Sequence, residues 1–139
     1  MIVLDTNVIS GVFRSSPDQQ VVSWLKTVGG DVAITAVTVA ELLASVHRLP
    51  DGRRKWELRA GINTALRPYR DTRSILSFDE DAAEAYAEIL SSRDAAGLPI
   101  AMADAQIAAI CRTHGAICAT RNSKDFARTG VELINPWIV

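Results

Sequence analysis

Carboxylate side chains occur at points of the sequence where they can meet and bind a hard metal ion. Asp5 follows an apolar run at the N-terminus, and Asp125 follows a short apolar run late in the chain. Glu41 and Asp104 lie near the starts of two expected helices. Carboxylates gathered in one pocket raise one another's pKa, and a divalent cation relieves that repulsion. Because Mg²⁺ or Mn²⁺ can activate water against a phosphodiester, the cluster favours metal-dependent hydrolysis.

The position of Asp5 is set by the residues before it. Met1–Leu4 is an unbroken apolar run, which is typical of a strand buried on both faces. Asp5 therefore stands where the strand ends, and ligands of open parallel sheets bind at the carboxyl ends of the strands. An ionised carboxylate there is costly unless a cation, a metal or a hydrogen-bond donor satisfies it.

Two interpretations of Glu41 remain open. Thr38 and Glu41 have the spacing of a capping box, in which the Glu41 side chain would return to the backbone of Thr38. In the other interpretation, Glu41 starts a helix directly after the second strand and faces the same sheet edge as Asp5.

Asp104 lies on the border of the apolar face of a helix expected over Ile100–His114. At 100° per residue it falls beside Ile107 and Cys111, so it faces the core rather than water. The helix dipole stabilises a carboxylate near the N-terminus by about 0.3–1 kcal/mol, which is small beside the cost of burying an unpaired charge. The alternatives are a structural salt bridge with an arginine and a metal or catalytic role.

The stretch Ala119–Phe126 also places polar side chains directly after a strand. One interpretation is an ordinary turn in which Asn122 or Ser123 caps a helical turn over Ser123–Ala127. The other places Asn122 and Asp125 at the carboxyl end of the sheet, beside Asp5.

Strands and helices are expected to alternate along the chain. The expected strands cover residues 1–4, 32–34, 74–78, 116–120 and, weakly, 132–134. Ser16 is expected to cap a helix that has Pro17 in its first turn and ends before Gly29. Ile9–Phe13 is expected to be a short helical or irregular segment, and the other expected helices are one that opens at Thr38, Arg53–Tyr69, Asp79–Ala95 and Ile100–His114. This alternation predicts an α/β domain with a mainly parallel sheet of four to five short strands flanked by helices.

The composition narrows the class of protein. A chain of 139 residues is long enough for one domain with a sizeable core, and Cys111 and Cys118 are expected to be small core residues. The net charge of −1 does not indicate a nucleic-acid binder, although 12 of the 15 basic residues are arginines, which suit phosphate contact. The uncharged runs are too short to span a bilayer and no secretory signal is evident, so we expect a cytoplasmic protein without a membrane partner.

Four motifs together resemble those of the PIN-domain family, and within it the VapC-type toxins of bacterial toxin–antitoxin pairs, near the FitB-like branch. The motifs occur in order, at the family's spacing and from end to end of the chain. They are Leu4–Asn7, Thr38–Leu42, Ala103–Ala108 and Ala119–Phe126. The resemblance implies a single PIN domain over residues 1–139 that acts as a Mg²⁺-dependent endoribonuclease.

The resemblance also implies a role for each matching side chain. The implied catalytic residues carry oxygen atoms at strand ends or helix starts, and they are Asp5, Glu41, Asp104, Asn122 and Asp125. Asp5 and Asp104 would ligate Mg²⁺ or Mn²⁺ directly, and Glu41 would help to position water. The implied supporting residues are Thr6, Asn7 and Thr120. Asn122 stands where many members have Asp, and Asp125 could supply the missing charge. Because Asn offers an oxygen but no negative charge, one metal ion is expected rather than two.

The resemblance further implies partners. A cognate antitoxin of the VapB or FitA type would join a homodimer of this chain, giving a heterotetramer or a larger assembly on operator DNA. The RNA substrate would meet basic residues near the site, for which the candidates are Arg14, Arg48, Arg53, Arg54, Arg121 and Lys124.

Two rival functions compete with this one. The chain could be a non-catalytic PIN module that acts in a DNA-bound regulatory complex with its antitoxin. A haloacid-dehalogenase-like phosphatase would need a second Asp two residues after Asp5, and Asn7 occupies that position.

Overall fold

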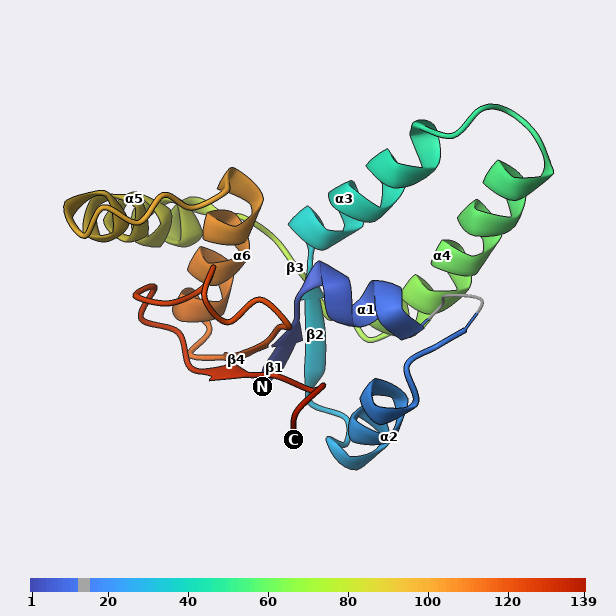
Figure 1. Ribbon diagram of the computed structural model, residues 1–139, viewed down its shortest axis with the longest axis horizontal. Helices are drawn as coiled ribbons and strands as arrows, with labels where there is room; N and C mark the ends of the chain where they lie inside the picture. Colours follow the sequence, from blue (N-terminus) through green and yellow to red (C-terminus); the bar gives the residue numbers. More distant parts are fainter. Residues whose placement is uncertain (13–15) are drawn as a thin grey trace.

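The computed structural model describes residues 1–12 and 16–139, in which a parallel sheet is flanked by helices (Figure 1). The sheet has five strands in the order β3-β2-β1-β4-β5. The strands are β1 (Ile2–Leu4), β2 (Val32–Thr35), β3 (Ile75–Leu76), β4 (Ile117–Ala119) and β5 (Leu133–Ile134). The helices are α1 (Thr6–Val12), α2 (Gln19–Thr27), α3 (Ala36–His47), α4 (Arg53–Asp71), α5 (Glu80–Ala95) and α6 (Met102–Thr113). The predicted fold class is confirmed, and the sheet is parallel throughout.

The central strand β1 carries Asp5 at its carboxyl end. β1 pairs with β2 on one side and with β4 on the other, so that Val3 lies between Ala33 and Cys118. The chain adds β2 and β3 on one side of β1, and β4 and β5 on the other. The crevice at the carboxyl ends of the strands where this order reverses is the usual ligand site of an open α/β sheet. Asp5 lies in that crevice, where its amide donates to the Ala119 carbonyl at 2.9 Å.

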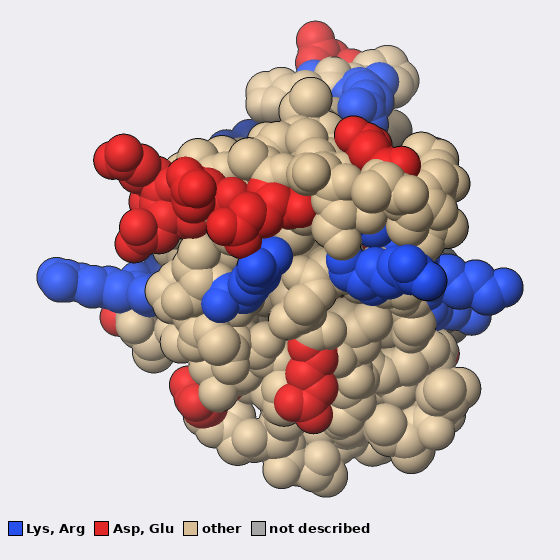
Figure 2. Space-filling view, turned by 90° about the vertical axis from the view of Figure 1, so that its left-hand side faces the viewer, with Lys and Arg blue, Asp and Glu red and all other residues tan. Residues whose placement is uncertain are grey.

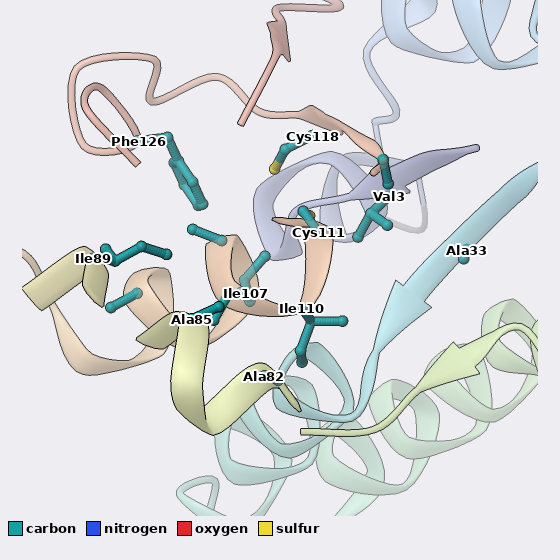
Figure 3. Close-up of a cluster of buried hydrophobic side chains, with 14 residues drawn as sticks. Val3, Ala33, Ala82, Ala85, Ile89, Ile107, Ile110, Cys111, Cys118 and Phe126 are labelled. Carbon is teal, nitrogen blue, oxygen red and sulfur yellow. The ribbon is translucent and has the colours of Figure 1, made fainter. Parts of the chain in front are cut away.

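Two buried clusters hold the sheet between its helices. One cluster lies under α5 and α6, where small alanines let the two helices approach and Ile107, Ile110 and Phe126 fill the space toward β1 (Figure 3). The other lies under α1 to α4 and includes Leu4 and Leu66, which are both fully buried. Because both faces of β1 are covered, its residues form an apolar run rather than an alternating pattern.

The two cysteines are buried and free, which confirms the prediction that they are core residues. Cys111 on α6 and Cys118 on β4 belong to the same cluster (Figure 3). The hydrogen bond between the two thiols, followed by burial, raises the pKa of Cys118, so this thiol stays protonated.

Helices α3 and α4 form a hairpin that extends away from the sheet on the side opposite α5 and α6 (Figure 1). The turn between them includes Gly52, whose φ of 150° suits glycine alone. None of the described helices combines the length and the apolar character needed to cross a bilayer.

The expected start of the second helix was wrong. Asp18, not Ser16, is the N-cap of α2, and its Oδ1 accepts from the amides of Gln20 at 3.0 Å and Val21 at 3.4 Å. Serine and aspartate cap about equally well, so local sequence does not choose between them. The burial of Val21 and Trp24 sets where the first turn lies, and only Asp18 then reaches its amides.

Three other helix starts also differ from expectation. α1 begins at Thr6 rather than Ile9, because the Asp5 carbonyl accepts from the amides that open the helix. α3 begins at Ala36, ahead of Thr38, and α6 begins at Met102, two residues after Ile100. Of the segment expected over Ile9–Phe13, the last residue lies outside the described residues.

Asp18→Ala should lower the free energy of unfolding by about 1 kcal/mol, because two amides in the first turn of α2 lose their acceptor. The matched variant Ser16→Ala should change it by less than about 0.5 kcal/mol, as expected for a surface substitution away from such a cap. Urea unfolding followed by circular dichroism measures both. Equal effects of the two substitutions would contradict the assignment of the cap.

Candidate active site

Side chains from four segments line one cavity of about 280 Å³ at the carboxyl edge of the sheet. The segments are the β1–α1 junction, the first half of α3, the first turn of α6 and the turn after β4. The lining residues are Asp5, Thr6, Asn7, Ser10, Glu41, Asp104 and Asn122. The fold therefore brings together residues that lie as far apart in the sequence as Asp5 and Asn122.

Asp5 is held in one orientation by two hydrogen bonds. Its side chain is 3% exposed, its Oδ1 accepts from the Thr6 amide at 2.8 Å, and its Oδ2 accepts from the Thr120 hydroxyl at 2.8 Å. Thr120 is fully buried at the end of β4. Since each carboxylate oxygen has two lone pairs, these bonds leave capacity for a further ligand on the side of the cavity.

The capping-box interpretation of Glu41 was wrong. α3 starts earlier than expected, and Thr35 is its N-cap, with a hydroxyl that accepts from the Thr38 amide at 3.1 Å. Glu41 is thus beyond the first turn, and its Oε1 accepts from the Thr6 hydroxyl at 2.7 Å. The Thr6 hydroxyl also lies 3.0 Å from that of Thr38. Thr6, the residue next to Asp5, therefore contacts both Glu41 and Thr38 of α3.

Asp104 lies in the first turn of α6 and is partly buried at the cavity wall. Within residues 1–12 and 16–139 no Lys or Arg forms an ion pair with it, so none of the described arginines supports the salt-bridge alternative. Burial, followed by the negative charges of Asp5, Asp125 and Glu41, raises the pKa of Asp104 to about 6. The positive charge of Arg93 acts in the opposite direction.

The pKa of Asp5 is also raised. Burial is the largest cause, and the negative charges of Glu41 and Asp125 add to it. The hydrogen bonds from Thr120 and Thr6 lower the pKa but do not cancel the rise. Among the described residues neither of the two carboxylates in this pocket has a cationic partner of its own, an arrangement that stabilises a bound cation.

The segment after β4 is a turn and not a helix to be capped. The amides of Asp125 and Phe126 donate to carbonyls three residues earlier, at 2.9 Å and 3.3 Å, and no regular helix follows. These bonds, with a third from the Ala127 amide to the Lys124 carbonyl at 3.4 Å, form the helical turn expected over Ser123–Ala127, but among the described residues neither Asn122 nor Ser123 caps it with its side chain. The Asn122 amide donates to the Thr120 hydroxyl at 3.0 Å, which places Asn122 at the cavity wall.

Asp125 is placed differently from the other predicted acidic residues. Its side chain is exposed and lines a neighbouring cavity of about 400 Å³ that shares Asn122 with the first one. Asp125 therefore acts on Asp5 and Asp104 through its charge rather than by lining their cavity.

The donor set suits a hard cation held mostly by water. In the described part of the chain no group of three His, Cys, Asp or Glu side chains is arranged to hold a metal ion. The groups that line the cavity offer oxygen from carboxylate, hydroxyl and amide side chains, without sulfur or imidazole. Mg²⁺ binds such oxygen ligands, takes one or two carboxylates and keeps several waters, so the chemistry of the site fits it.

Comparison with known proteins identifies the family. The family described as PIN domain matches residues 2–132. The chain belongs to the PIN-domain family. The toxin FitB of Neisseria gonorrhoeae is 41% identical over 138 residues, covering 99% of each chain. The VapC ribonuclease Y4jK of Sinorhizobium fredii is 36% identical over 138 residues, covering 99% of this chain and 98% of the relative.

Solved structures agree with this assignment. A structure of FitAB bound to an IR36 DNA fragment contains a chain with 39% identity and a TM-score of 0.90, and the match covers 100% of this chain and 97% of that one. The resemblance to VapC- and FitB-like members of the family, inferred from four motifs, is confirmed.

Three of the predicted RNA-binding residues of this PIN domain lie near the site. Arg48 lines a larger cavity of about 630 Å³, which shares Thr6 and Glu41 with the site. Arg121 and Lys124 line the cavity of about 400 Å³ beside Asn122.

The other predicted RNA-binding residues are placed elsewhere. Arg53 and Arg54 stand at the start of α4, at the end of the hairpin, and line none of these three cavities. Arg53 pairs with Glu57 at 2.9 Å across one turn of α4. Arg14 lies outside the described residues.

Sequence reasoning missed two side chains of the site. Ser10 lines the cavity one helical turn after Thr6, and a periodic pattern reveals this only when α1 is known to begin at Thr6. Thr38 was interpreted as a cap, whereas its hydroxyl contacts that of Thr6.

Asp104→Asn should stabilise the metal-free protein increasingly as the pH rises. Asp104 has a pKa of about 6 in the folded wild type and of about 4 in an unfolded chain. Between these values the folded state binds more protons than the unfolded chain, so the free energy of unfolding of wild type falls as the pH rises. The free energy of unfolding of the variant, relative to that of wild type, should increase by roughly 1–2 kcal/mol between about pH 4 and about pH 7. This increase is smaller than for a fully buried carboxyl, because Asp104 is only partly buried.

Denaturant unfolding in buffer with EDTA measures this difference. An exposed aspartate of α5 supplies the control, because Asp94→Asn removes a carboxylate away from the cavity. A pH-independent difference between Asp104→Asn and wild type would show that Asp104 is not destabilised by its neighbours.

Proposed function

We propose that this PIN domain is a Mg²⁺-dependent endoribonuclease and the toxin component of a type II toxin–antitoxin pair. The observation that carries the proposal is the meeting of Asp5, Glu41 and Asp104 at one cavity, where burial and mutual repulsion raise the pKa values of both aspartates. The names of two relatives, a VapC ribonuclease and the toxin FitB, support the same activity. We place this activity and its RNA substrate in the cytoplasm.

Each residue has a role in the proposed hydrolysis. Asp5 and Asp104 would hold Mg²⁺ or Mn²⁺, which would supply a Lewis acid to activate water and neutralise charge on the phosphate. Glu41 accepts a hydrogen bond from the attacking water, and the Thr6 hydroxyl holds Glu41 in place at 2.7 Å. The water oxygen bonds to phosphorus as one ester P–O bond breaks; the proton that the water loses passes to Glu41, and the leaving oxygen takes up a proton from solvent. Thr120 fixes Asp5, while Asn7 and Asn122 line the cavity as polar contacts for the substrate.

The distribution of charge favours one direction of approach for RNA. The side formed by α5 and α6 carries a gathered patch of acidic side chains, with a belt of Lys and Arg directly below it (Figure 2). The acidic residues of α5 are Glu80, Asp81, Glu84, Glu88 and Asp94. RNA phosphates are repelled there, so we assign RNA contact to the basic residues beside the cavities, namely Arg48, Arg121 and Lys124.

The partners of the relatives suggest those of this chain. FitAB is a two-component assembly bound to DNA in its solved structure. We infer that this chain forms a homodimer that binds a FitA- or VapB-like antitoxin, as a heterotetramer or a larger complex on operator DNA. The cavity of about 630 Å³ along α3 lies next to Glu41 and offers mostly apolar wall to an antitoxin segment.

A second candidate function is a non-catalytic PIN module in a DNA-bound regulatory complex. It is favoured by the solved FitAB complex, in which a relative of this chain is part of an assembly on DNA. Under this alternative the carboxylates would serve assembly, and RNA cleavage would not depend on them.

Purified wild-type protein, freed of antitoxin, should cleave cellular RNA with Mg²⁺ or Mn²⁺ and not with EDTA. Asp104→Asn should lower kcat/KM by at least about 100-fold, because residues that only support metal ligands already cost about 10–100-fold when changed. Gel analysis of a mixed RNA substrate shows cleavage, and a fluorescent oligonucleotide gives the rates.

Asp94→Asn is the matched control and should retain wild-type activity. Equal cleavage by wild type and Asp104→Asn would identify a contaminating nuclease or a wrong site. Metal and antitoxin binding without any cleavage would favour the non-catalytic module.

Asn122→Asp should strengthen metal binding, because it adds a negative charge at the wall of the same cavity. Wild type should bind a single Mn²⁺, and the variant should bind Mn²⁺ roughly tenfold more tightly or take up a second ion. Isothermal titration calorimetry measures both affinity and stoichiometry. The same change on α4, Asn63→Asp, should have no effect, and two ions bound to wild type would contradict the one-metal proposal.

A further inference from the structure

Arg93 is a buried cation whose partners are backbone carbonyls. It lies in the last turn of α5 and is 3% exposed. A guanidinium stays charged in a protein, so its burial is costly unless its donors find acceptors. Within the described residues Arg93 forms no ion pair with a carboxylate. The buried side chain is therefore held by hydrogen bonds to carbonyls and not by a salt bridge.

The guanidinium joins two segments that are distant in the sequence. Its Nε donates to the Leu98 carbonyl at 3.0 Å and its Nη2 to the Pro99 carbonyl at 2.9 Å. Its Nη1 donates to the Ala127 carbonyl at 2.6 Å and to the Lys124 carbonyl at 3.5 Å. One planar fork thus ties the connection before α6 to the turn after β4.

Both segments carry residues of the proposed active site. The connection leads directly into the first turn of α6, which holds Asp104. The turn holds Asn122 and Asp125, and its other end is fixed where Thr120 accepts from the Asn122 amide at 3.0 Å and donates to Asp5 at 2.8 Å. The turn is therefore held at one end by Asp5 and at the other by Arg93.

A lysine could not make the same set of bonds. Arginine presents its donors in a rigid plane, whereas lysine offers one point charge on a flexible stem. The Arg93 charge also acts on the site, since it lowers the pKa of Asp104 against the effect of the surrounding carboxylates.

We infer that Arg93 is a positioning residue, which fixes the Asn122–Ala127 turn and the residues before α6 so that Asn122 and Asp125 stay beside Asp5 and Asp104. Its kinetic consequence rests on the proposed ribonuclease function, while its effect on the turn does not.

The first test compares Arg93→Lys with Arg112→Lys. Arg112 is the matched control, because it also joins α5 to α6, through Glu88 at 2.7 Å, but on the exposed surface. Hydrogen–deuterium exchange should become at least about tenfold faster at residues 97–101 and 122–127 in Arg93→Lys, and stay unchanged there in Arg112→Lys. Exchange in α3 should be equal in all three proteins.

The second test is a double-mutant cycle on RNA cleavage. Arg93→Lys should lower kcat by about 10- to 100-fold, as expected for a small misplacement of active-site groups, with KM within about threefold of wild type. If Arg93 acts through the turn, adding Asp125→Asn to Arg93→Lys should lower kcat by less than about a further threefold, because the effects of coupled sites are not additive.

Unchanged exchange in residues 122–127, or fully additive losses in the cycle, would overturn the inference. If wild type cleaves no RNA, the ribonuclease proposal fails, and the exchange experiment still decides the role of Arg93. If Arg93→Lys does not fold, native-state exchange of wild type decides it. The Nε–H of Arg93 and the amides of residues 125–127 should then open together, and independent openings would contradict the inference.

Discussion

The constraint that shapes the rest of the site is the electrostatic repulsion between carboxylates that the fold brings together at the carboxyl end of its central strand. Asp5 ends the middle strand at the point where the strand order reverses, and it is almost completely buried. Asp104 reaches the same cavity from the start of α6, and burial together with neighbouring charges raises its pKa to about 6. A protein selected for stability alone would place a cation or an apolar residue here. Under the proposed function the cost is retained because the cluster would receive a cation from solution.

Threonine hydroxyls organise this cluster where arginine or lysine would neutralise it. Thr120 and Thr6 hold Asp5 and Glu41 by hydrogen bonds of 2.8 Å and 2.7 Å, and neither hydroxyl brings a positive charge. Fixed dipoles orient the carboxylates but leave most of their negative charge unbalanced. The positive charge of Arg93 acts on Asp104, but its bonds go to backbone carbonyls and not to the carboxylates.

The two sides of the molecule differ in what they offer to partners. α5 is acidic along its exposed face, whereas the α3–α4 hairpin extends away from the sheet on the other side (Figure 1). The cavities beside the carboxylates are bordered by Arg48, Arg121 and Lys124. An RNA strand and an antitoxin segment would therefore compete for the same region, which is the simplest physical basis for inhibition of a toxin by its partner.

The sequence alone determined the fold class and most of the carboxylate cluster. Short unbroken apolar runs alternating with helical patterns predict a parallel sheet, and an acid directly after such a run must lie at the sheet edge. These are local patterns, readable without knowing which elements touch. Tertiary structure decided the rest. The capping box at Thr38 is locally as good as the cap at Thr35, and only the packed start of α3 turns Glu41 toward Thr6.

The same reason explains the other differences. Asp125 lies outside the cavity of Asp5 because the turn after β4 follows bonds to Arg93, a residue that is distant in the sequence and shows no local signal. Asp18 displaced Ser16 as a cap because the burial of α2 fixed its first turn. Residue types and spacing therefore determined which groups could do chemistry, while contacts between distant segments decided how those groups face one another.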